Sequence, residues 1–150
     1  MNCLVSRVLA AAVAFGVPGL ASAADLDVKG KWVGKSHTVV AGKDAIWPNN
    51  TGGYDKPGLF EKDMVIEIVG QQDRRFWGKT IMGGAGDTKV EKPFVGHLHG
   101  KDGTKFLYAD HDGVMTGEIE GDVLTFCYTH PTAPAGSSTV VSCSSVKRTR

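Results

Sequence analysis

Apolar and polar residues alternate along the chain between Phe94 and Tyr128, in short runs separated by tight turns. Each run is rich in Val, Phe, Tyr and Leu and ends at a turn that contains Gly and Asp. This pattern is typical of consecutive antiparallel hairpins. It predicts four strands, at residues 94–99, 104–109, 114–119 and 123–128.

The remainder of the chain extends this pattern to eight strands. The other four are predicted at 31–40, 64–69, 75–81 and 139–148, and no segment shows helical periodicity over more than one turn. A meander of this length exposes unpaired strand edges unless it closes on itself. The predicted fold class is therefore all-β, an eight-stranded antiparallel up-and-down barrel.

The alternation also assigns a face to each strand residue, because successive side chains point to opposite sides of a sheet. Charged residues are expected to face water, and their neighbours are expected to face inward. Inward glycines either let a strand bend or leave space inside the barrel, and bending is the favoured interpretation. A large residue and a glycine recur two positions apart on the inner face, as Trp32-x-Gly34, Phe76-x-Gly78, Phe94-x-Gly96 and Met115-x-Gly117.

Two cysteines, Cys127 and Cys143, lie in the last two predicted strands. If they face each other in a hairpin, Phe126 lies opposite Ser144, which agrees with the faces assigned from the charged residues. A cross-strand disulfide requires that the two Cβ atoms share a face. The register therefore predicts a structural disulfide between Cys127 and Cys143, of the kind that persists in oxidising compartments.

The first 23 residues have the features of a secretory signal peptide. Arg7 supplies the positive charge, residues 8–17 the apolar stretch, and Ala21-Ser22-Ala23 a small-x-small cleavage site. The apolar stretch is too short to span a bilayer as a helix. We therefore expect a signal peptide at 1–23 and a single β-barrel domain at 24–150, located in the periplasm or outside the cell after cleavage near Ala23.

The charge of the chain is nearly balanced, with 17 basic and 16 acidic side chains, and one of the basic ones, Arg7, lies in the predicted signal peptide. Such a chain has no bulk attraction for nucleic acids or anionic lipids. Residues 147–150 form a short basic tail, and exposure to solvent accounts for its charge without a partner. Neither a nucleic acid nor a membrane is expected as a partner.

The connections between the predicted strands differ in length at the two ends of the barrel. In an up-and-down barrel successive connections alternate between the ends, so the first, third and seventh, at 41–60, 82–92 and 130–138, share one end. The density of Pro and Gly in 41–60 excludes regular structure there. Because long loops in compact domains commonly carry binding groups, this is the predicted functional end.

At this point the chain resembles the calycins, the group that holds the lipocalins and avidins. Gly30-Lys31-Trp32 matches the Gly-x-Trp at the start of their first strand, and Arg148 is similar to the basic residue that packs over that tryptophan at the closed end. The lipocalin Thr-Asp-Tyr motif and a helix after the last strand are missing, which is closer to the avidins. Avidin-type biotin sites use several inward tryptophans, and none follows Trp77 here. The resemblance therefore implies small-molecule binding in general.

Polar residues of the predicted inner face concentrate in the half of the barrel nearest the long loops. Buried hydroxyls need partners, so they bond to one another, to trapped water or to a ligand. Aromatic and flexible apolar side chains lie between them, which suits a compact ligand with an apolar body and one or two polar groups. Trp47, in the first loop, is expected to close over it. The predicted ligand-binding residues are Thr38, Trp47, Met64, Thr80, Phe94, Tyr108, Phe126, Tyr128 and Ser142.

The sequence is also compatible with a secreted protein-interaction or inhibitor module. In this alternative, Trp47, Tyr54 and Phe60 of the 41–60 loop dock on a partner protein, as exposed aromatic side chains do at hot spots. The space inside the barrel separates the two hypotheses. Space for no more than one or two water molecules would contradict ligand binding, and a filled barrel with a projecting aromatic loop favours the interaction module.

No pattern for catalysis or for a bound metal is found. Every Asp and Glu lies in a predicted turn or outward position, and no Ser stands in a strand–turn–helix context. His97 and His99 share the outer face of one strand, where a solvated surface is expected. Asp110-His111-Asp112-Gly113 lacks the rest of a calcium-loop pattern and predicts a turn. A non-enzymatic protein without a cofactor is expected.

Overall fold

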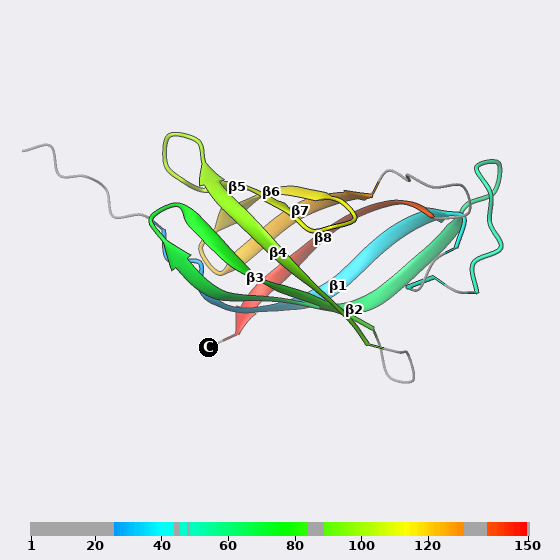
Figure 1. The fold of residues 1–150 in the computed structure, drawn as a ribbon, viewed down its shortest axis with the longest axis horizontal. Helices are drawn as coiled ribbons and strands as arrows, with labels where there is room; N and C mark the ends of the chain where they lie inside the picture. Colours follow the sequence, from blue (N-terminus) through cyan, green and yellow to red (C-terminus); the bar gives the residue numbers. More distant parts are fainter. Residues whose placement is uncertain (1–25, 44–45, 48, 84–88, 131–137, 150) are drawn as a thin grey trace, which may run out of the picture.

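The computed structural model describes residues 26–43, 46–47, 49–83, 89–130 and 138–149, so the predicted signal peptide and most of the last long loop lie outside the described residues. Eight antiparallel strands form a closed barrel in which each strand pairs with the next and the last pairs with the first (Figure 1). The predicted all-β up-and-down barrel is confirmed. The strands are β1 (Gly30–Ala41), β2 (Gly58–Gln72), β3 (Arg75–Met82), β4 (Val90–His99), β5 (Lys105–Ala109), β6 (Val114–Glu120), β7 (Val123–His130) and β8 (Thr139–Thr149).

Two strands begin several residues before their predicted starts. Strand β2 begins at Gly58 rather than at residue 64, because it pairs with β1 to the end of that strand, with Phe60 opposite Thr38. Strand β4 begins at Val90 rather than at residue 94, through pairing with β3. The ladder of backbone hydrogen bonds outweighs the local signals of glycine and proline. The expectation that no regular structure occurs in 41–60 is therefore wrong for Ala41, the last residue of β1, and for its last three residues.

The predicted faces are confirmed, and the inward glycines have an observable cause. The ring of Phe106 lies against Gly117, where an added Cβ would be 2.6 Å from the ring and 2.2 Å from the Thr125 carbonyl oxygen. The ring of Phe76 lies against Gly96 in the same way, at 2.4 Å. These two glycines therefore let the aromatic rings of Phe106 and Phe76 approach the barrel wall closely.

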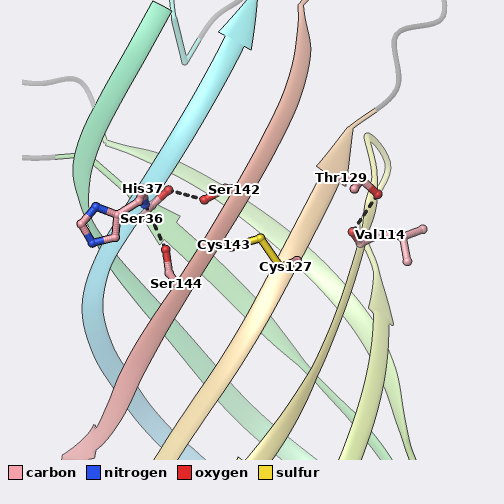
Figure 2. The surroundings of a disulfide bond; sticks show 8 residues. All are labelled: Ser36, His37, Val114, Cys127, Thr129, Ser142, Cys143 and Ser144. Atoms are coloured by element: carbon pink, nitrogen blue, oxygen red, sulfur yellow. Dashed lines mark hydrogen bonds between the residues drawn. A yellow bond between two sulfur atoms is a disulfide. The ribbon is translucent and has the colours of Figure 1, made fainter.

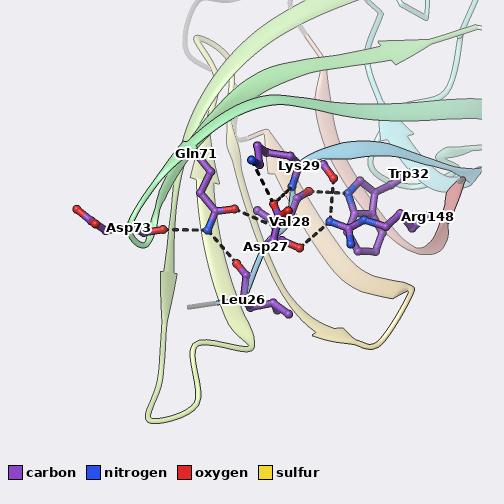
Figure 3. A network of polar contacts seen from close by, with 8 residues as sticks. All are labelled: Leu26, Asp27, Val28, Lys29, Trp32, Gln71, Asp73 and Arg148. Carbon is purple, nitrogen blue, oxygen red and sulfur yellow. Dashed lines mark hydrogen bonds and ion pairs between the residues drawn. The ribbon is translucent and has the colours of Figure 1, made fainter. Parts of the chain in front are cut away.

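The tight-turn end of the barrel is closed by the segment before β1 (Figure 3). Trp32 is 1% exposed, and its Nε1 donates a hydrogen bond to the Val28 carbonyl oxygen at 3.1 Å. The guanidinium of Arg148 lies over the Trp32 ring, 4.9 Å from the centroid, as the resemblance to calycins implied. Its Nη2 also donates to the carbonyl oxygens of Asp27 and Lys29. Arg148 thus joins the last strand to the segment that covers the core.

The predicted disulfide joins β7 and β8 on the outer face of the barrel (Figure 2). Cys127 and Cys143 are paired directly across the two strands, with their Cα atoms 4.1 Å apart, and both are exposed. Phe126 lies opposite Ser144, as the predicted register requires.

Among the described residues no helix is long and apolar enough to cross a membrane.

Reduction of the Cys127–Cys143 disulfide is expected to lower the free energy of unfolding by about 2–4 kcal/mol, because the bond restricts the unfolded chain. Urea unfolding with and without a reducing agent measures the difference. Without the predicted signal peptide, which contains Cys3, the protein unfolded without a reducing agent should contain no titratable thiol. Two titratable thiols in that sample would contradict the disulfide.

Gly117→Ala is expected to lower the free energy of unfolding by about 1–3 kcal/mol, since the added methyl group must displace Phe106 or the Thr125 backbone. Gly53→Ala is the matched control, because an added Cβ there meets no atom within 4 Å. Thermal or urea unfolding compares the two variants. Equal stability of both would mean that the ring does not pack on Gly117.

Candidate functional site

The interior of the barrel is apolar toward the tight-turn end and becomes polar toward the end of the long connections, at the right of Figure 1. We call this second half of the interior the mouth. The strand pairing brings five inward hydroxyl residues together in the mouth, as the sequence predicted. They are Thr38, Thr80, Tyr108, Tyr128 and Ser142.

On one wall of the mouth, three buried hydroxyls from β1 and β8 form a hydrogen-bonded cluster. Ser36 Oγ lies 2.6 Å from Thr38 Oγ1 and 2.8 Å from Ser142 Oγ, the second contact being visible in Figure 2. Thr38 and Ser142 are neighbours because they pair directly across the junction that closes the barrel. Each hydroxyl therefore has a partner within the protein, which removes the cost of its burial.

Tyr108 occupies the opposite wall. Its hydroxyl lies 2.9 Å from Thr80 Oγ1, and its ring stacks on Phe94 with the centroids 4.2 Å apart. Burial raises the pKa of Tyr108 far above its ordinary value, although the hydrogen bond with Thr80 acts in the opposite direction. The phenol therefore stays protonated at physiological pH and is able to donate a hydrogen bond.

Tyr128 is held at the rim by Asp110, which begins the turn between β5 and β6. The Tyr128 hydroxyl donates a hydrogen bond to Asp110 Oδ1 at 3.1 Å. Asp110 Oδ1 also accepts hydrogen bonds from the backbone N–H groups of Asp112 and Gly113, both at 2.8 Å. Burial and the negative charge of Asp110 raise the pKa of Tyr128. Both tyrosines are therefore protonated groups in fixed positions.

An inward ion pair that sequence reasoning missed lies beside Tyr128. Lys92 of β4 bonds to the carboxylate of Asp112, and the two side chains are only 13% and 26% exposed. Burial by itself would raise the pKa of Asp112, but the hydrogen bond and charge of Lys92 outweigh it and lower the pKa. When β4 is extended back from Phe94, the alternation of faces places Lys92 on the inner face. Extending β2 back from Met64 places Lys62 on the inner face in the same way.

Trp47 covers the mouth from the connection between β1 and β2. Its side chain is 3% exposed and packs against Val40 and Val140. Asn50, which sequence reasoning also missed, holds this turn: its backbone N–H donates to the Trp47 carbonyl oxygen, and its side-chain amide donates to the Val40 and Gly42 carbonyl oxygens. Trp47 is therefore anchored over the barrel and does not project from it.

The expectation that three aromatic residues of 41–60 are exposed is wrong for two of them. Trp47 is buried, and Phe60 is half-buried with its ring centroid 4.7 Å from that of Trp47. Their rings cover the mouth of the barrel together, which keeps both largely out of water. Tyr54 alone projects, at 79% exposure, and its hydroxyl lies 2.8 Å from Thr139 Oγ1.

The cavity beneath Trp47 has a volume of about 30 Å³, which accommodates one or two water molecules. The barrel is thus nearly filled, so the expectation of a ligand-sized cavity is wrong. The aromatic loop is folded in, so the projecting loop of the alternative is not found either. Any occupant larger than water has to take the place of Trp47. Of the predicted ligand-binding residues, Phe94 lies behind Tyr108, and the others line the cavity: Thr38, Trp47, Met64, Thr80, Tyr108, Phe126, Tyr128 and Ser142.

Among the described residues, one group of potential metal ligands lies in the turn between β5 and β6. Asp110, His111 and Asp112 bring three ligand atoms within 4.8 Å of one another there. The two carboxylates are already bonded to Tyr128, to Lys92 and to backbone N–H groups, which is the arrangement of a turn. His97 and His99 are exposed on the outer face of β4, the surface predicted for them.

Asp112→Asn is expected to lower the free energy of unfolding at pH 7 but not in acid. The folded-state pKa of Asp112 lies below its ordinary value of 3.8, so the stabilisation is present above that pH and is lost as the pH falls through the folded-state pKa. Urea unfolding curves of the two proteins should therefore converge in acid. A difference that persists there unchanged would exclude the charge of Asp112 as its source.

The closed eight-stranded barrel with Arg148 over Trp32 is consistent with a calycin-like fold. No family model, curated protein or solved structure matches the chain.

Proposed function

We propose that this protein is an exported binding protein that holds a compact small molecule in the mouth of its barrel, in the place that the Trp47 side chain fills in this structure. One observation carries the proposal: oriented hydroxyls lie within an otherwise apolar wall, beneath a single aromatic side chain from a loop. Small-molecule sites typically combine apolar walls with a few convergent polar groups. In a barrel of this size the interior has room for one small ligand.

The packing of Trp47 supports its role as a replaceable cover. The side chain belongs to a small cluster with Val40 and Val140, separate from the main core that includes Trp32 and Phe106. Its withdrawal would therefore leave the main core intact. The vacated space would have the dimensions of an indole ring and would be bordered by Tyr108 and Tyr128. Local opening of a loop costs less than global unfolding, which makes such an exchange accessible.

The chemistry of the mouth favours binding over catalysis. Its two tyrosines have raised pKa values, so they donate hydrogen bonds and are poor proton acceptors at neutral pH. The serine and threonine hydroxyls are bonded to one another or to Tyr108. Export belongs to the same proposal, because an exposed disulfide such as Cys127–Cys143 persists in oxidising compartments.

Native mass spectrometry of the protein purified from its own source tests the proposal. A retained small molecule is expected, and its binding to Tyr108→Phe and to Tyr128→Phe should be weaker by about 1–2 kcal/mol each, because a polar group of the ligand loses its partner. Tyr54→Phe, on the exposed loop, is the matched control and should bind normally. Equal affinity of all three variants would place the ligand elsewhere.

Trp47→Ala is expected to bind that ligand more tightly, mainly through faster association, since no indole ring has to withdraw before the ligand enters. Stopped-flow mixing at several ligand concentrations measures the association rate. The fold of the variant is checked by circular dichroism. An unchanged association rate and affinity in a folded variant would mean that the ligand does not take the place of Trp47.

A further inference from the structure

We propose that the outer face of β3 to β6 is a docking surface for a second copy of this chain. This inference goes beyond the proposed function, because the surface lies outside the barrel and does not depend on what the mouth holds. We call this surface the outer patch. Its exposed apolar residues are Trp77, Val95, Leu107, Ala109 and Val114.

The strand register places the residues of the outer patch side by side. Trp77 of β3 pairs with Val95 of β4, and Val95 pairs with Ala109 of β5. Ala109 in turn pairs with Val114 of β6, and Leu107 lies two residues before Ala109 on the same face. The four strands are neighbours in the closed barrel (Figure 1). The exposed apolar surface is therefore continuous from one strand to the next.

The outer patch has the area that a specific interface needs. Trp77 is 45% exposed and Val95 is 68% exposed. Together the five side chains expose roughly 400 Å² of apolar surface, which is in the range of patches that mark interaction sites. An interface of standard size covers about 800 Å² on each partner, and a little more than half of this area is apolar. The outer patch therefore supplies the apolar part of one side of such an interface.

The outer patch carries both a projecting ring and a groove. The Trp77 ring leans over Gly70 of β2, where an added Cβ would lie 2.3 Å from it. The ring therefore leaves the outside of β4 open, and a groove of about 520 Å³ extends from Trp77 to Leu107 over the backbone of Gly96. A two-fold axis brings the same surface of two copies together. Because ring and groove lie on one face, the ring of each copy has a groove to enter on the other.

The charges around the outer patch favour a second copy over a charged partner. Arg75 and Lys79 flank Trp77 on β3, and each is paired with an acid of its own chain. Arg75 lies 3.1 Å from Asp73, and Lys79 lies 2.8 Å from Glu91. Neither a polyanion nor a strongly basic protein therefore finds an excess of opposite charge here.

The charge of the whole chain also permits association between copies. One of the 17 basic side chains lies in the predicted signal peptide, so 16 basic and 16 acidic side chains remain without it. Two copies of such a chain do not repel each other through their net charge. A net charge near zero promotes association when an apolar surface is available.

Sedimentation equilibrium of the mature protein from about 1 to about 100 µM measures the association, since interfaces of this size have micromolar or lower dissociation constants. We expect a dimer at the upper end of this range. Val95→Lys brings like charges together in the interface and should weaken the dimer at least about tenfold. Val33→Lys is the matched control, because Val33 is 42% exposed on the outer face of β1 and lies outside the outer patch. Circular dichroism confirms that both variants are folded.

Tryptophan fluorescence tests the same face in the unaltered protein, so the test does not depend on the folding of a variant. Of the three tryptophans, Trp32 and Trp47 are buried and Trp77 is exposed. Acrylamide should therefore quench the fluorescence less at about 100 µM than at about 1 µM, because association covers Trp77. Trp77→Phe should remove this dependence on concentration.

A dimer that Val95→Lys weakens and Val33→Lys does not, with Trp77 shielded on association, supports the inference. A monomer throughout the concentration range overturns it and leaves the outer patch to a partner of a different kind. A dimer that Val95→Lys leaves intact, or in which acrylamide reaches Trp77 as before, also overturns it, because the copies then meet at another face. None of these outcomes bears on ligand binding in the mouth.

Discussion

The pairing of the first strand with the last is the constraint on which the rest of the structure depends. β1 and β8 are joined from Lys31 and Thr149 at one end to Ala41 and Thr139 at the other, which leaves no strand edge unpaired along that junction. Closure fixes which side chains point inward, because every strand then has a single inner face. It also sets Trp32 beneath Arg148 at one end and Thr38 beside Ser142 at the other. The register of β1 against β8 thus positions both the residues that close the core and the hydroxyl residues of the mouth.

The mouth balances two requirements that conflict. Its buried hydroxyls must have partners, and they find them in one another and in Asp110. Its apolar wall must be kept from water, and Trp47 does this with a ring that belongs to a loop rather than to a strand. A ligand of the proposed kind would have to supply contacts at least as favourable as those of the indole ring that it displaces.

Much of this structure could be predicted from the sequence because a strand period of two is a strong signal. The charged residues alone assigned the faces, and the cysteines confirmed the register of the last hairpin. Strand ends were harder to predict. Gly58 and Pro93 are signals for loops, yet pairing with β1 and β3 carries both strands past them. The strand residues that were not predicted, at 58–63 and 90–93, include Lys62 and Lys92. These two inward lysines were therefore not predicted either.

The position of Trp47 could be predicted only in outline, since its loop has no regular pattern. The hydrogen bonds of Asn50 decide whether the ring projects or folds in, and they depend on carbonyl groups that the end of β1 provides. A crystal structure of the protein bound to the small molecule that it retains from its own source tests this account most directly. It should show the ligand beside Tyr108 and Val140, with Trp47 withdrawn. Trp47 still packed on Val140, with the molecule bound elsewhere or absent, would contradict it.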